Sequence, residues 1–240
     1  MKLAIDIGNT FIKCAVFNKN KIIFRVSIKE PEELLKTTNK YMPSHIIISS
    51  VVPVKSKNFV NFLQKHTGSP IETVNYKKTN LKLRVPSPSS IGNDRICNVF
   101  AAIKLYPSPL IIVDFGTATT YDVINSKNEF IGGVIAPGVE TSSANLISKA
   151  ALLKNIKFEF PSRVVGNNTE KNIQSGIMYG AVSQVEGLIK KIEAERKAQF
   201  NVLLTGGFAK LLSPHLSIKH ILDIDLTLKG IFYIYEDINK

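Results

Sequence analysis

The sequence contains only two cysteines and no tryptophan. Cys14 and Cys97 are too few for a disulfide framework or, by themselves, a four-ligand zinc site. No apolar run approaches the roughly 18 residues that a membrane-spanning helix needs, and Asp6 falls where a signal peptide would require its apolar stretch. The 240 residues are 44% apolar and 21% charged. We therefore expect a soluble, cytoplasmic protein with one large domain or two small ones.

Arginine is also scarce, although the net charge is +12: only 5 of the 31 basic residues are arginine. Arginine is the residue that most often reads bases and grips phosphates in a bidentate manner. The lysines are scattered, with small clusters at 77–78 and 190–191. The charge is therefore explained either by nucleic-acid binding or by a lysine-rich composition, and the second is favoured. An anionic small substrate would gain from the same field.

Several common catalytic motifs are missing. The sequence has no G-x-G-x-x-G, no G-x-x-x-x-G-K-[ST], no C-x-x-C, no H-E-x-x-H and no G-x-S-x-G. The four histidines are dispersed, which gives little support to a histidine metal cluster or a catalytic triad.

The order of apolar runs and turns is that of an α/β protein. Strands are predicted at 3–7, 11–17 and 22–28, then a helix beginning at Pro31, a buried strand at 45–50, and helices at 56–66 and 94–105. After residues 107–109 the pattern begins again, with strands at 110–113, 118–124 and 130–135. A long helix at 171–198 and a strand at 201–204 follow.

The two halves share one local motif. Asp6 and Asp114 each close an apolar strand, each has glycine two residues later, and each is followed by a second strand and a polar turn. This repetition predicts two duplicated domains, residues 1–109 and 110–240, and ligand sites commonly lie between such units.

The repeated D-x-G-[NT] corners are typical of phosphate binding. Glycine after a strand lets the backbone approach a phosphate with its N–H groups directed at the oxygens. The aspartate would repel a phosphate, so it is best explained as an organiser of a cation or its waters. A third glycine turn, 205–207, completes a candidate nucleotide clamp. The alternative is that both corners are ordinary hairpin turns.

A second candidate site lies at residues 91–95, Ile-Gly-Asn-Asp-Arg. Arg95 could hold an anionic substrate, and Asp94, ionised at neutral pH, could accept a proton from a hydroxyl group. Phosphoryl transfer needs little beyond positioning, cation charge and such an acceptor. The alternative is an acid that merely stabilises a helix start.

The small residues along 171–198 also allow two interpretations: an ordinary core helix, or a helix that another helix approaches closely.

Taken together, these motifs resemble those of the type III pantothenate kinases, in the acetate and sugar kinase/Hsp70/actin superfamily. Residues 6–10 match the first phosphate motif of the family, 92–95 its G-x-D-R motif, and 114–120 its second phosphate motif. Further matches occur in family order over almost the whole chain, at 49–53, 132–138, 168–169, 175–187, 205–207 and 226–230. The resemblance implies two ribonuclease H-like domains, of the actin/Hsp70 ATPase type, with a cleft between them.

The resemblance also implies an activity and its site residues. The expected reaction is transfer of a phosphoryl group from ATP to pantothenate, with Asp94 as proton acceptor, in a homodimer with shared sites. Asp114 would bind a monovalent cation, K⁺ or NH₄⁺, and Asp6 would organise Mg²⁺ on ATP. The implied ATP-binding residues are Asp6, Ile7, Gly8, Asn9, Thr10, Phe11, Ile12, Lys13 and Thr117. The implied pantothenate-binding residues are Gly92, Asn93, Asp94, Arg95 and, from the neighbouring subunit, Thr169.

The sequence departs from the family pattern at a few places. Val85 stands where many members carry a tyrosine that touches pantothenate, Cys14-Ala15 replaces a frequent Gly-Leu, and Lys154 replaces a Leu-Pro helix end. None of these removes a charged catalytic group. Two other functions stay open: a kinase of the same superfamily with another acceptor, and a non-catalytic transcriptional accessory factor, which the basic charge alone favours.

Overall fold

The computed structural model describes residues 1–149 and 157–239, and it divides into two compact units. The first unit comprises Met1–Tyr106 and the C-terminal segment that starts at Asp225, and the second comprises Pro107–Ile224. The division after Tyr106 falls close to the expected one. The C-terminal segment, however, belongs to the first unit, because its helix packs into the core of that unit. Lys154, one of the departures named above, lies outside the described residues.

The first unit consists of β1 (Lys2–Ile7), β2 (Ile12–Asn18), β3 (Lys21–Ile28), η1 (Pro31–Leu34), α1 (Leu35–Tyr41), β4 (His45–Ser50), α2 (Pro53–His66), β5 (Ile71–Thr73), η2 (Tyr76–Lys78), β6 (Lys82–Leu83), η3 (Pro88–Ser90), α3 (Asn93–Leu105) and α7 (Leu226–Ile238). The second consists of β7 (Leu110–Phe115), β8 (Ala118–Ile124), β9 (Glu129–Pro137), α4 (Val139–Lys149), α5 (Thr169–Arg196), β10 (Asn201–Gly206), α6 (Ala209–Leu212), η4 (Ser213–His215) and β11 (His220–Leu222).

The sheets of the two units have the same topology. In the first the strand order is β3-β2-β1-β4-β5, with β1–β2 and β2–β3 antiparallel and β1–β4 and β4–β5 parallel. In the second the strands β9-β8-β7-β10-β11 repeat this order and these directions. The corresponding strands therefore occur in the same chain order, as the repeated sequence pattern predicts.

The first sheet is covered on both faces by helices. Leu3, Ile5 and Ile7 alternate along β1 and pack with residues of β4 and α2, as the two-residue period of a strand requires. Ala4 faces the other way, into a core formed with α3 and α7. Asp6 follows Ala4 by two residues, so its side chain lies on the α3 and α7 face of the sheet.

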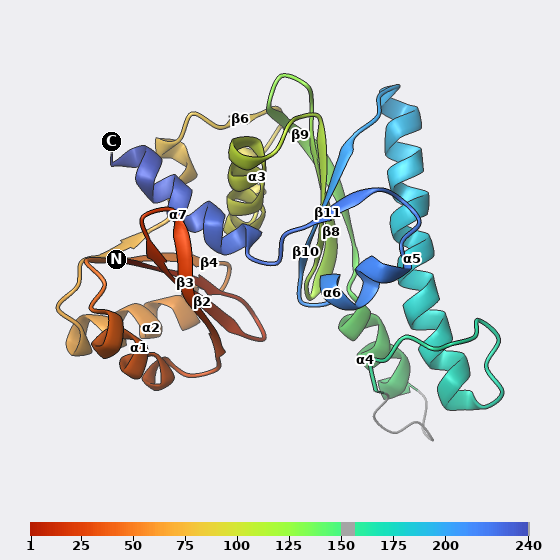
Figure 1. Cartoon of the computed structure of the whole chain (residues 1–240), viewed down its shortest axis with the longest axis horizontal. Coiled ribbons are helices and arrows are strands. Elements are labelled where there is room, and N and C mark those ends of the chain that lie inside the picture. The colour runs from red at the N-terminus through yellow and green to blue at the C-terminus, as the bar shows by residue number, and fades with distance from the viewer. Residues whose placement is uncertain (150–156, 240) are drawn as a thin grey trace. The chain divides into compact units, whose positions relative to one another are not determined.

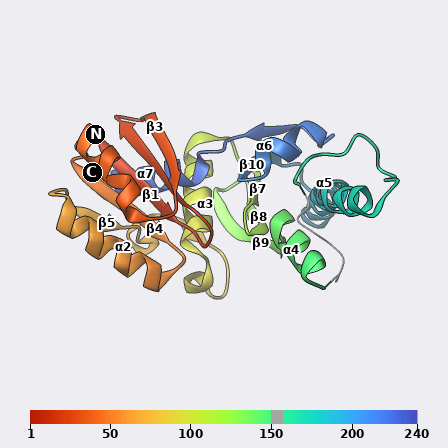
Figure 2. The same cartoon turned by 90° about the horizontal axis from the view of Figure 1, so that it is seen from below.

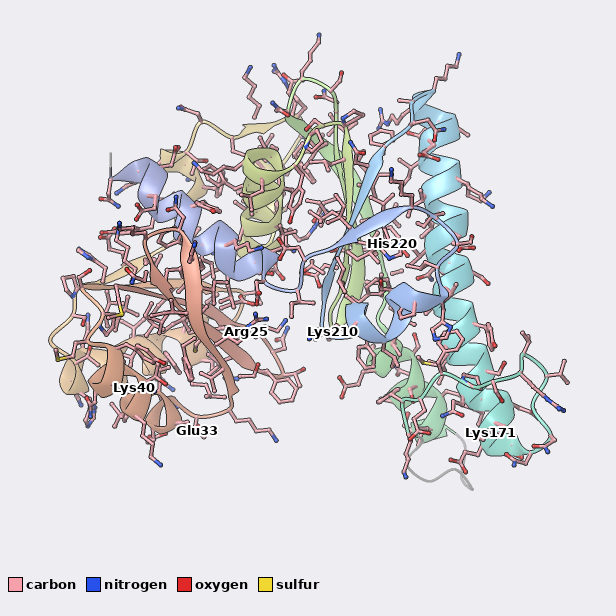
Figure 3. The ribbon with its side chains drawn as sticks, viewed as in Figure 1. Arg25, Glu33, Lys40, Lys171, Lys210 and His220 are labelled. Atoms are coloured by element: carbon pink, nitrogen blue, oxygen red, sulfur yellow. The ribbon has the colours of Figure 1, made fainter. Side chains whose placement is uncertain are left out.

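Helix α7 lies beside α3 in the first unit, so the blue C-terminal helix stands among the red and yellow N-terminal elements (Figure 1). The ring of Phe232 stacks on that of Phe17 in β2, with centroids 4.2 Å apart. Arg25 of β3 (labelled in Figure 3) forms an ion pair of 3.1 Å with Asp225, next to the start of α7. The C-terminal helix is therefore a core element of the first unit.

The second unit is built around the long helix α5, whose 28 residues are viewed nearly end-on in Figure 2. Val182, Val185 and Ile189 of this helix pack against Val113 and Phe115 of β7. An apolar stripe at helical spacing thus covers one face of the second sheet. The sequence predicts a stripe through Ile177, Val185 and Leu188, and of these only Val185 is fully buried, because the buried face is turned towards Met178, Val182 and Ile189.

Local signals explain where several elements begin. The expected helix at Pro31 starts as the 3₁₀ turn η1 and continues as α1. Helix α2 begins at Pro53, three residues before the expected position, because proline is well suited to the first helical turn. Strand β4 has the predicted bounds. Among the helices that the structure describes, none is long and apolar enough to span a bilayer.

Candidate active site

The first phosphate corner connects β1 to β2. Within the sheet, Asp6 pairs with Lys13 on one side and with Ser49 of β4 on the other. The turn is tight: the N–H of Gly8 donates to the carbonyl of Phe11 at 3.1 Å, and a Cβ at position 8 would stand 3.1 Å from that oxygen. Asn9, Thr10 and Phe11 are exposed. The turn thus presents its backbone to solvent directly beside the strand-end carboxylate.

The Gly-Asn-Asp-Arg motif forms the start of α3. Gly92 is the extended residue before the helix, and a Cβ there would lie 2.5 Å from Oδ1 of Asp94. The same oxygen accepts a hydrogen bond of 2.8 Å from the N–H of Arg95. The Asn93 amide donates to the carbonyl of Ser50 at 3.2 Å. Gly92 therefore makes room for the Asp94 carboxylate, and Asn93 ties the motif to the end of β4.

Two contacts bring these motifs together within the first unit: Ser49 pairs with Asp6 in the sheet, and Asn93, next to Asp94, donates to the carbonyl of Ser50. Cys97 of α3 is buried on the same face of the sheet. Its thiol is completely buried, and burial raises its pKa strongly. The negative charges of Asp6 and Asp94 raise it further. The structure thus brings together the first phosphate corner and the G-x-D-R motif, which lie far apart in the sequence.

The second phosphate corner is built around Asp114 at the end of β7. A Cβ at Gly206 would lie 2.4 Å from Oδ1 of Asp114, and one at Gly116 would lie 3.5 Å away. Gly206 has φ +96°, a conformation that glycine adopts far more easily than other residues. The two glycines leave a cradle around one carboxylate oxygen.

The backbone beyond this cradle is also held in place. A Cβ at Gly138 would meet the carbonyl oxygens of Thr117 and Gly116 at 2.4 and 2.5 Å. The Thr141 hydroxyl donates to the carbonyl of Thr117 at 2.6 Å. Position 138 therefore requires glycine, because any side chain there would overlap the backbone of Gly116 and Thr117 at the second corner.

The two corners occupy equivalent positions in their sheets. Asp6 lies opposite Lys13 on the antiparallel neighbour and Ser49 on the parallel one. Asp114 lies opposite Thr120 and Thr205 in the same relationship. A hydroxyl residue thus stands beside each strand-end aspartate. No spacing along the chain indicates these pairs, because each is set by the register between strands.

Thr169 is the first residue of α5 and lies far along the chain from both corners. Asn168 precedes the helix, and its side chain accepts a hydrogen bond of 2.9 Å from the N–H of Lys171, which is labelled in Figure 3. The Thr169 side chain is exposed. Close by, residues 164–166 and the side of α5 from Asn172 to Ser183 line a groove of about 450 Å³. Within the second unit, Thr169 is thus free to serve a ligand or a partner.

The departures from the family pattern occupy ordinary positions in the first unit. Val85 is half-buried in the connection between β6 and η3. Cys14 and Ala15 lie in the cores on opposite faces of the first sheet.

Two α/β units whose sheets share this topology, each with a strand-end aspartate and a glycine corner, have the fold of actin/Hsp70-type ATPase domains, and the prediction of two such domains is confirmed in fold. One solved structure with this fold is an activator of 2-hydroxyisocaproyl-CoA dehydratase from Clostridium difficile with bound ADPNP. It has a TM-score of 0.59 and 13% identity, covering 99% of this chain and 95% of that one.

The family follows from sequence comparisons. The model of the type III pantothenate kinase family matches residues 2–191. A type III pantothenate kinase from Sulfurihydrogenibium sp. (strain YO3AOP1) is 45% identical, over 98% of this chain and 99% of that protein. Another, from Bacillus cytotoxicus, is 39% identical, over 98% and 96%. The chain belongs to the type III pantothenate kinase family, and it is a kinase.

Proposed function

We propose that the protein transfers the γ-phosphoryl group of ATP to the primary hydroxyl of pantothenate. The product is 4′-phosphopantothenate, and the reaction is the first step towards coenzyme A in the cytoplasm. The observation that carries the proposal is the approach of the two motifs within the first unit, with Ser49 beside Asp6 in the sheet and Asn93, next to Asp94, bonded to the carbonyl of Ser50, in a chain of this family. A phosphate-binding corner and a proton acceptor then stand on the same face of one sheet.

Each motif has one task in this reaction. The corner formed by residues 6–13, together with Thr117 of the second corner, binds the ATP phosphates through backbone N–H groups, hydroxyls and the Lys13 ammonium. Gly92, Asn93 and Arg95 hold pantothenate, with Arg95 on its carboxylate. Asp94 accepts the proton of the attacking hydroxyl. Because Oδ1 of Asp94 already accepts a bond from the Arg95 N–H, the carboxylate is oriented before the substrate binds.

The residues at the corners fit the cations that the reaction requires. The Asp114 carboxylate lies in a cradle that side chains at Gly116 and Gly206 would fill, and carboxylate and carbonyl oxygens are suitable ligands for K⁺ or NH₄⁺. Asp6 is placed to organise Mg²⁺ or its waters on ATP. These cations supply positive charge that stabilises the charge developing on the transferred group.

The functional unit in this proposal is a homodimer. Thr169 is exposed at the start of α5, beside a groove lined by small residues such as Gly176 and Gly180. We assign Thr169 to the pantothenate site of the partner subunit. The nearby exposed Val164 and Val165 would be covered in the same contact.

The decisive experiment measures ADP release from ATP with and without pantothenate, in potassium buffer. We expect release that depends on pantothenate, and Asp94→Asn should lower kcat by about 10²–10⁴-fold, the usual contribution of a general base. Glu32→Gln, which removes a carboxylate charge at an exposed position of η1, serves as the control. Activity of Asp94→Asn near that of the wild type would refute the assignment of the base.

Other results would point to other functions. If a folded dimer releases ADP only with a different alcohol, the protein is a kinase with another acceptor. If it releases none with any acceptor, and binds DNA or RNA at 200 mM salt, the accessory-factor interpretation replaces the kinase, because nonspecific phosphate attraction weakens steeply with salt.

A further inference from the structure

Helix α7 approaches the helix that carries Asp94 more closely than side chains allow. Gly230 of α7 lies against the Cys97 peptide group in α3: a Cβ at position 230 would stand 2.0 Å from the carbonyl oxygen of Cys97 and 2.4 Å from its carbonyl carbon. Both are backbone atoms, so no side-chain rotation could relieve the overlap. The contact depends on the absence of a side chain at residue 230.

A buried hydrogen bond fixes the same pair of helices. The Thr227 hydroxyl donates to Oδ1 of Asn98 at 2.8 Å, and the two residues are separated by 129 positions in the chain. Asn98 is fully buried and Thr227 is almost so. Loss of a bond between groups that water cannot reach is costly, because the remaining polar atom keeps its desolvation penalty.

Helix α7 is packed against the sheet as well as against α3. On the side of the sheet, Phe232 stacks on Phe17 with an angle of 2° between the rings. Leu228 and Ile231 are buried in the same core as Ile96 and Cys97 of α3. A side chain inserted at position 230 would therefore displace α3, including its first turn with Asp94, more easily than it would displace α7 from the sheet.

We infer that Gly230 and Thr227 are positioning residues for Asp94, an inference that rests on the proposed function. Asp94 precedes Cys97 by one helical turn, and a helix transmits a shift along its axis as a rigid rod. Helix α7, near the C-terminal end of the chain, thus determines the position of the Asp94 carboxylate. A misplacement of about 1 Å can lower the rate by about 10²-fold when the reacting groups must be aligned.

Two pairs of variants test this role. Gly230→Ala inserts the clashing methyl group, and Gly68→Ala is its control in the same unit, where nothing lies within 4 Å of an added Cβ. Thr227→Val removes the hydroxyl and keeps the shape, whereas Thr227→Ser keeps the hydroxyl. The measurements are kcat, the separate KM values for pantothenate and ATP, and amide hydrogen exchange across 93–105 with 53–66 as the internal reference.

If these residues position Asp94, the variants should affect the kinetics with pantothenate much more than those with ATP. Gly230→Ala should lower kcat/KM for pantothenate by about 10–100-fold, with KM for ATP changed less than about twofold, because the added methyl meets α3 and not the phosphate corners. Thr227→Val should lose several-fold and Thr227→Ser should recover most of it. Gly68→Ala should behave like the wild type. Hydrogen exchange should accelerate in 93–105 and not in 53–66.

Three results would overturn the inference: wild-type kcat and KM in folded Gly230→Ala, equal losses in Thr227→Val and Thr227→Ser, or a parallel loss of ATP affinity that marks general destabilisation. If the wild type itself does not phosphorylate pantothenate, the proposed function fails separately. The hydrogen exchange of 93–105 then decides whether α7 fixes α3: unchanged exchange in Gly230→Ala and Thr227→Val would refute the contact as a positioning device.

Discussion

Gly206 lies so close to Asp114 that a single methyl group on it would come within 2.4 Å of the Asp114 carboxylate oxygen. The residue also has a positive φ of +96°. Backbone conformation and close approach thus both require glycine at this position. A side chain added at position 206 would therefore meet both a steric overlap with the aspartate and an unfavourable backbone conformation.

We predict that Gly206→Ala destabilises the protein and disables the second corner. The control is Gly132→Ala, because Gly132 also has a positive φ, +120°, but nothing lies within 4 Å of an added Cβ. Gly132→Ala should lose about 1–3 kcal/mol from backbone strain alone. Gly206→Ala should lose more and should also lose turnover. Urea unfolding and ADP release measure the two effects, and equal losses of stability would contradict the steric argument.

Exchange of the monovalent cation should reveal the role of Asp114. Turnover of the wild type should fall when sodium replaces potassium, because the smaller, more strongly hydrated ion is a poorer fit for a site made for K⁺ or NH₄⁺. Asp114→Asn should be slow in both buffers, because the neutral amide has lost the charge that holds the cation. Glu32→Gln should keep the potassium response. Equal turnover of the wild type in sodium and potassium would leave the kinase but remove the cation site.

Mixing two inactive variants tests whether sites are shared between subunits. Asp94→Asn lacks the base, and Thr169→Ala lacks the contact offered to the partner. After subunit exchange in an equal mixture, half of the dimers combine one chain of each kind. One of the two sites in such a dimer is intact, so about a quarter of wild-type activity should return. Absence of any recovery across mixing ratios, with exchange verified by mass, would contradict a shared site.

Stability should decline at alkaline pH because of the two buried thiols. Burial raises the pKa of both Cys14 and Cys97 in the folded state, and the negative charge of Asp6 adds to this. Above the ordinary thiol pKa of about 8.5, the unfolded chain releases protons that the folded chain keeps. The unfolded state then binds fewer protons, so the free energy of unfolding falls as pH rises, by at most about 1.4 kcal/mol per pH unit and thiol.

The measurement is urea unfolding between pH 7 and 9.5. Cys14→Ala/Cys97→Ala should show a flatter decline than the wild type, although its stability at pH 7 is lower because of the lost packing. Below pH 8 both proteins should be insensitive to pH from this source. Identical slopes would show that other groups, such as the buried Tyr121, whose pKa is also raised by burial, control the decline.

Much of the architecture was predictable because a short apolar run between turn residues indicates a buried strand directly. The apolar runs at 3–7, 45–50 and 201–204 all correspond to observed strands. The placement of α7 was not predictable. Its sequence is apolar on nearly all sides, so it indicates burial without indicating which core receives it.

The candidate site was predictable to a similar extent. Sequence patterns identify Asp6, Asp94 and Asp114, because a strand end or helix start with glycine leaves a local trace. They do not show that Ser49 stands beside Asp6, or that Gly230 meets the Cys97 backbone, because these contacts depend on register and on packing between distant segments. The roles of the three aspartates stay predictions until the measurements above are made.

The return of the last helix to the first unit has a consequence for synthesis on the ribosome. The core formed by Ala4, Ile96 and Ile231 cannot close until residues beyond 225 have left the exit tunnel. The second unit ends at Ile224, so its residues are all available earlier. The half of the protein that is made first is therefore the last to be completed, and a stalled or shortened chain would expose its unfinished apolar surface to chaperones and proteases.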